Sequence, residues 1–141
     1  MKEAIHLRVP VAANASIGLL ELVATNDEGD AVPFTGASGQ TFLGYSESPA
    51  DNAGGAAGNR KAAVTTGLEE IDVAAGVTPK PGQNAYVETS TSVTNEEPAL
   101  ANVDANCVGT FVASSQIHAN KWVVDFRPAY FRRRVAVATV E

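Results

Sequence analysis

Short apolar runs alternate with polar turns along most of this chain, and the first run already shows a period of two. Residues 4–11 place apolar side chains on one face and polar ones on the other, as a half-buried strand does. The apolar face carries Ile5, Leu7 and Val9, and the polar face carries His6 and Arg8. Because Pro10 has no backbone N–H, we expect this strand to lie at the edge of a sheet or to end there.

Further strands follow the same pattern, separated by glycine, proline, asparagine and aspartate. Two pairs are typical of hairpins: residues 18–25 with 31–34, and residues 106–115 with 121–128. Other strands are expected at residues 41–48, 61–67, 68–76, 83–91 and 133–140. The total of about nine or ten short strands predicts an all-β fold with little helix, an antiparallel β-sandwich, jelly roll or small barrel.

Two helix starts compete with this interpretation. Thr66 with Glu69, and Thr94 with Glu97, have the spacing of a capping box, in which two side chains satisfy the free amides of a first helical turn. At the first of these positions we favour a strand, because the alternation of residues 69–76 ends at a glycine turn.

Small residues dominate residues 48–60, "SPADNAGGAAGNR", and no periodicity survives there. Such a composition buries little surface, so we expect an exposed, flexible loop. The chain has 141 residues, 45% of them hydrophobic, which is enough for one core. We therefore predict a single domain over residues 1–141.

Composition limits the cellular context. No stretch approaches the roughly 20 apolar residues that span a bilayer, and charges and Pro10 interrupt the N-terminal segment before any signal-like apolar region. The single cysteine, Cys107, has no disulfide partner within the chain. The sequence thus predicts a soluble, unprocessed protein that is made in the cytoplasm and has no membrane partner.

Charge is distributed unevenly along the chain, whose formal net charge is -6. Residues 120–141 carry five basic and two acidic side chains, a net charge of +3, and the other 119 residues carry a net charge of -9. An acidic body repels nucleic acid at long range, so we expect no direct nucleic-acid binding. Arginine forks at a local patch suit an acidic protein surface better. The alternative, that these arginines only guard a terminal edge strand, stays open.

The predicted interface residues come from both ends of the chain. They are Ile5, Leu7, Arg8, Arg127, Arg132, Arg133, Arg134, Val135 and Val137.

Catalytic patterns are absent from the sequence. The two histidines, His6 and His118, lie far apart along the chain, and neither G-x-S-x-G nor a glycine-rich phosphate-binding motif occurs. Cys107 begins an apolar run and is expected to be buried and inert. We therefore predict no catalytic residue, no metal site, no cofactor and no enzyme activity.

Three segments together carry a resemblance to a known family. They are "GLLELVATNDEGDAVPFTGASGQTFLGYSES", "GVTPKPGQNAYVET" and "NCVGTFVASSQIHANKWVVDFRP". Over residues 17–128 the chain resembles the head-decoration, or cement, proteins of tailed bacteriophages. The closing "FRRRVAVATVE" lies outside the shared pattern.

The resemblance implies a structural virion protein. Such proteins are made in the host bacterial cytoplasm, oligomerise as dimers or trimers, and bind the outer surface of the capsid across junctions between major capsid subunits. Residues 1–11 and 129–141 are the segments expected to make these contacts, because unpaired strand edges can add a strand to a neighbour.

Two other classes remain as alternatives. A carbohydrate-binding or adhesin-like β module would need an exposed aromatic platform, and most of the few aromatic residues fall within expected strands. A small hydrolase would need histidines and carboxylates inside a barrel, which two distant histidines do not favour.

Overall fold

The computed structural model describes residues 6–128, and within them the chain is mostly β-structure with little helix, as predicted. The strands are β1 (His6–Pro10), β2 (Ser16–Ile17), β3 (Leu22–Thr25), β4 (Ala31–Pro33), β5 (Thr41–Ser46), β6 (Ala50–Asp51), β7 (Lys61–Thr65), β8 (Gly67–Val73), β9 (Asn84–Thr89), β10 (Ser92–Thr94), β11 (Cys107–Ser114) and β12 (Lys121–Phe126). The helical turns are η1 (Leu100–Asn102) and α1 (Val103–Asn106). These twelve strands exceed the expected nine or ten, because pieces as short as β2 and β6 have no readable alternation.

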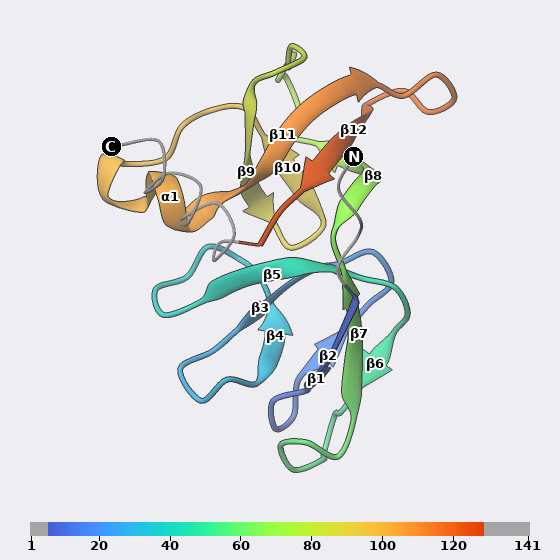
Figure 1. Ribbon diagram of the computed structural model, residues 1–141, viewed down its shortest axis with the longest axis vertical. Helices are drawn as coiled ribbons and strands as arrows, with labels where there is room; N and C mark the ends of the chain where they lie inside the picture. Colours follow the sequence, from blue (N-terminus) through green and yellow to red (C-terminus); the bar gives the residue numbers. More distant parts are fainter. Residues whose placement is uncertain (1–5, 129–141) are drawn as a thin grey trace.

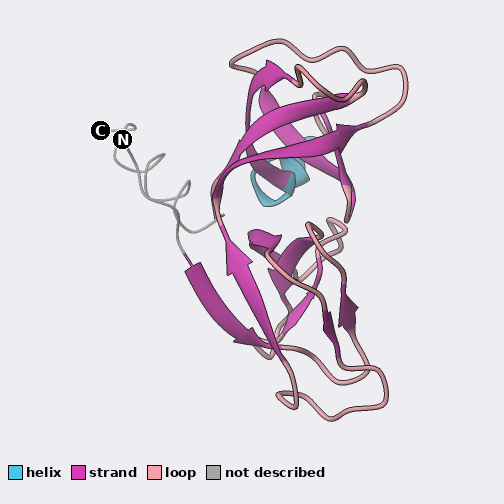
Figure 2. Cartoon of the chain, turned by 90° about the vertical axis from the view of Figure 1, so that its right-hand side faces the viewer, coloured by secondary structure: helices cyan, strands magenta, loops and turns pink. Residues whose placement is uncertain are grey.

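The strands form two main layers. A five-stranded sheet has the order β1-β7-β5-β3-β4, and a closed five-stranded barrel has the order β10-β8-β12-β11-β9. Figure 1 shows the barrel above the sheet, and Figure 2 shows the same stacking from the side. The chain crosses from one to the other where β7 runs into β8.

Both predicted hairpins are present: β3 pairs with β4 and β11 with β12, each antiparallel. In the first, the Asn26 side-chain oxygen accepts hydrogen bonds from the amides of Glu28 and Asp30, each at 3.0 Å. Gly29, at φ 85°, takes the left-handed position of that turn. The local turn chemistry therefore fixes this pair of strands.

Barrel closure departs from the antiparallel expectation. Strand β10 turns back antiparallel along β9 and then pairs parallel with β8, at Ser92 with Asp72 and at Val93 with Val73. At the first capping-box position, Thr66 lies between β7 and β8, and Glu69 lies within β8 (Gly67–Val73), so the strand interpretation is confirmed there. At the second capping-box position, Thr94 accepts a hydrogen bond from the amide of Glu96, and the helical residues begin only at Leu100.

One hydrophobic cluster joins the sheet to the barrel. Phe126 of β12 lies against two rings of β5, with ring centroids 6.4 Å from Phe42 and 5.4 Å from Tyr45. Burial raises the pKa of Tyr45, and the charges of Glu69 and Glu47 raise it further. The hydroxyl therefore stays protonated at neutral pH.

A second cluster fills the other side of the sheet, beneath β2 and β6. It contains Val9, Val11, Ile17, Val23, Ala31, Ala50, Ala62 and Val64. The sheet is thus buried on both faces over much of its area, which explains why its strands read as short apolar runs.

The segment at residues 48–60 is more structured than expected. It contains β6, which pairs with β2, and the buried side chain of Asn52. The Asn52 amide nitrogen donates to the carbonyl oxygens of Ala12 and Ala56, each at 3.0 Å. The hydrogen bond from Asn52 to Ala12 therefore holds this segment against a distant part of the chain, which the composition of the segment did not predict.

Strand β6 also offers a test of local electrostatics. The carboxylate of Asp51 accepts a hydrogen bond from the Ser16 hydroxyl at 2.6 Å and from the amide of Ala53 at 2.9 Å. These bonds, the Ser16 bond first, lower the pKa of Asp51. We expect Ser16→Ala to raise that pKa toward its ordinary value, measured by an NMR titration of the Asp51 carboxyl carbon. An unchanged titration would contradict the assignment of the serine as the main cause.

Candidate functional site

Only three of the predicted interface residues lie in the described part of the chain. Leu7 and Arg8 are on β1, both exposed, and Arg127 follows β12. The others lie outside the described residues: Ile5, Arg132, Arg133, Arg134, Val135 and Val137.

Arg127 is engaged within the chain. Its guanidinium donates to the carboxylate of Asp125 at 2.8 Å, and both side chains are mostly covered. Its charge is therefore compensated by Asp125 of β12, two positions earlier in the chain.

Strand β1 is an edge of the five-stranded sheet, as Pro10 predicted. It pairs with β7 antiparallel, with Arg8 opposite Ala63. The amide of Val11 donates to the carbonyl of Arg60 at 2.9 Å. Hydrogen-bonded and non-bonded residue pairs alternate along an antiparallel ladder, so this bond determines which residues of β1 bond to β7. Residues 7 and 9 bond to β7, and the backbone groups of His6 and Arg8 face away from it.

The carbonyl of Ala63, the residue opposite Arg8, accepts a hydrogen bond from the amide of Glu47 at 2.8 Å. Ala63 therefore bonds on the side of β7 away from β1, which agrees with this assignment. Strand β1 thus presents the N–H and C=O groups of two residues along an edge that pairs with no strand among residues 6–128, and Leu7 beside them is 40% exposed.

Cations gather along this same edge. Lys61 lies opposite Pro10 and diagonally next to Arg8, and Arg60 lies beside Val11. The side chains of Arg8, Arg60 and Lys61 are all exposed. Among residues 6–128, the ion pairs of Lys and Arg side chains are Lys121 with Asp72 and Arg127 with Asp125. We call Leu7, Arg8, Arg60 and Lys61 the basic edge.

Two members of the basic edge, Arg60 and Lys61, were missed in the sequence. They close the glycine-rich segment, where "NRK" looks like ordinary loop charge. Only the pairing of β1 with β7 brings Lys61 diagonally next to Arg8 and Arg60 next to Val11, about fifty positions apart in the chain.

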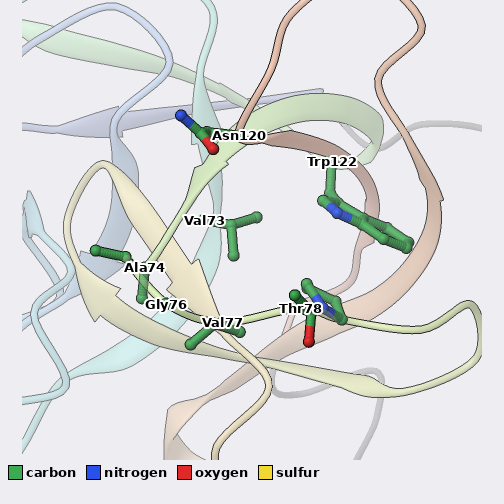
Figure 3. Close-up of a pocket in the computed structure, with 9 residues that line it drawn as sticks. Val73, Ala74, Gly76, Val77, Thr78, Asn120 and Trp122 are labelled. Carbon is green, nitrogen blue, oxygen red and sulfur yellow. The ribbon is translucent and has the colours of Figure 1, made fainter.

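A second feature lies at the open end of the barrel. A hollow of about 520 Å³ is lined by Val73 at the end of β8, by residues 74–79 of the following loop, and by Asn120 and Trp122. Figure 3 shows these side chains arranged around it. We call it the barrel-mouth pocket.

Within residues 6–128, no three His, Cys, Asp or Glu side chains come together in a group that could hold a metal ion. Over the same residues, every helix is too short to cross a bilayer. The chain matches no protein-family model, no curated protein and no solved structure.

Proposed function

We propose that this protein is a structural component of a phage virion that binds the outer surface of the capsid and bridges neighbouring major capsid subunits. The observation that carries the proposal is the basic edge, an edge strand whose outer side is paired with no strand among residues 6–128 and which carries or adjoins three exposed cations, on a protein of net charge -6. The resemblance of residues 17–128 to cement proteins supports the same conclusion. The proposal does not depend on a jelly-roll strand order, which stays a prediction.

The basic edge suits a partner segment that is extended and acidic. The outward backbone groups of His6 and Arg8 can pair with an added strand, which gives affinity through the main chain. Arg8, Arg60 and Lys61 would then lie beside the partner's carboxylates, which gives selectivity and faster association. Exposed Leu7 adds apolar contact on the other face.

A second copy of this chain is a poorer partner at this edge. Pairing two copies here would bring two sets of cations together, and facing like charges destabilise a pair of strands. The dimer or trimer that we predict would therefore use another surface. Several copies, each making modest contacts to neighbouring capsid subunits, then bind with high avidity.

Charge reversal at the basic edge provides the test. We expect Arg8→Glu and Lys61→Glu each to weaken binding to capsids by about tenfold or more, because a cation facing carboxylates becomes a repelling anion. Co-sedimentation with capsids that lack the protein measures this. Wild-type binding should also weaken with added salt, and the dependence should flatten in both variants.

Lys80→Glu is the matched control, since Lys80 is exposed on the β8–β9 loop, on the barrel rather than the sheet. It makes the same change in net charge and should bind like the wild type. Equal losses in all three variants would mean that overall charge, and not the basic edge, governs attachment.

A further inference from the structure

The barrel-mouth pocket is not used by the docking described above. It is lined by Val73 at the end of β8, by the loop at residues 74–79, and by Asn120 and Trp122. Pockets at the mouths of β-barrels are common ligand sites, and about 520 Å³ lies within the usual size range.

Trp122 is the aromatic side chain available at this mouth. It is the single tryptophan of the chain, and among the described aromatic residues it is the one that is only partly buried. Phe111 packs against it edge to face, with ring centroids 5.6 Å apart at 83°. Because Phe111 is fully buried, the indole is held from the core side while part of it lines the hollow.

The polar chemistry of the lining is neutral throughout, since none of its nine residues is ionisable. Thr78 brings a hydroxyl group to the lining. Ala75, Gly76 and Thr78 are exposed, and within residues 6–128 their amides donate to no backbone carbonyl. A fitting ligand is therefore uncharged, with one apolar face and several hydroxyl groups.

The loop around the hollow is fixed at both ends. The amide of Ala74 donates to the carbonyl of Val93 at 2.9 Å, and that of Gly82 donates to the carbonyl of Phe111 at 2.8 Å. A turn between them is closed by the bond from Val77 to Ala74 at 3.2 Å, with Gly76 in the left-handed region at φ 79°. A wall that is already folded loses little conformational entropy when a ligand binds.

We propose that the barrel-mouth pocket binds a ring of an uncharged saccharide, with the C–H face of the sugar on the indole of Trp122 and its hydroxyl groups on Thr78 and these amides of the loop. An apolar side chain of a partner protein fits less well, because it would leave these polar groups without partners. This activity is separate from capsid binding and does not rest on it.

The single tryptophan makes the test direct, because fluorescence excited selectively at tryptophan, and not at the three tyrosines, reports on this pocket. We expect maltohexaose or hexa-N-acetylchitohexaose to shift and quench the emission with saturation, whereas an oligogalacturonate of equal length leaves it unchanged. Thr78→Val should weaken the binding about three- to tenfold through the lost hydrogen bond.

Thr41→Val is the matched control, since Thr41 is exposed on β5 in the other layer and should leave the affinity unchanged. Trp122→Phe should weaken binding, and the new phenyl ring should keep some of the packing on Phe111. Calorimetry measures this affinity, because the variant has no tryptophan fluorescence. Three results would overturn the proposal: no saturable response to either neutral hexasaccharide, an equal response to the acidic one, or a response only to an apolar fluorescent probe.

Discussion

Replacing Gly109 with alanine is expected to prevent stable folding of the barrel. Gly109 lies in the middle of the barrel sheet, on β11, opposite Ala85 of β9 and Phe126 of β12. A Cβ atom added there would stand 2.1 Å from the carbonyl oxygen of Asp125 and 2.9 Å from its carbonyl carbon. These are backbone atoms of a paired strand, so they cannot move without breaking the ladder. We expect a loss of about 3 kcal/mol or more in the free energy of unfolding, measured by urea denaturation.

Gly18→Ala is the control for this prediction. Gly18 has no left-handed backbone requirement, and an added Cβ would meet the nearest atom, a carboxylate oxygen of Glu21, at an ordinary 3.7 Å. Its free energy of unfolding should be unchanged or slightly raised, because alanine restricts the unfolded chain. If Gly109→Ala unfolded at the same urea concentration as Gly18→Ala, the strand pairing described for β11 and β12 would be wrong.

Asn52→Asp is expected to give the second large loss. Asn52 is 3% exposed, and its amide nitrogen donates to Ala12 and Ala56 with a longer contact of 3.4 Å to Val11. An aspartate would place a buried negative charge against these carbonyl oxygens. We expect about 3 kcal/mol of destabilisation at neutral pH, measured by urea denaturation.

The sign of its pH dependence follows from burial. Desolvation and the carbonyl oxygens disfavour the charged form, so the folded-state pKa of the new carboxyl group would be raised above its unfolded value of about 3.9. Relative to the wild type, Asn52→Asp should therefore regain stability as the pH falls from 7 toward the unfolded value. Asn59→Asp adds the same charge at an exposed position of the same loop and should cost little at any pH. Equal behaviour of the two variants would contradict the anchoring role of Asn52.

Local chemistry explains which parts of the fold could be predicted. The hairpin of β3 and β4 follows from Asn26, whose side chain caps its own turn, and from a glycine where φ is positive. Pro10 marked β1 as an edge strand because it lacks an amide hydrogen. Features of this kind depend on a few neighbouring residues, so they can be predicted from the local sequence.

Barrel closure and the order of residues 48–60 could not be predicted in the same way. The parallel contact of β8 with β10 depends on the path of β9 and on packing across the whole barrel. Asn52 finds its acceptor at Ala12, forty positions earlier in the chain. A composition of small residues predicts a loop, and it contains no sign of such a distant partner.

Part of the basic edge could be predicted from local sequence, and part of it depends on the pairing of distant strands. Leu7 and Arg8 were found because they belong to a recognisable strand, whereas Arg60 and Lys61 join them only through strand pairing. Arg127, which looked like a docking residue, is held by Asp125, two positions earlier near the end of β12.

Attachment to a capsid can be measured by titrating the full chain onto capsids from a phage that carries this gene, prepared with the gene deleted. We expect saturable binding, with a fixed number of copies per capsid and a higher temperature of DNA release. A folded protein that leaves both the sedimentation and the heat resistance of these capsids unchanged at every concentration would contradict the proposed attachment.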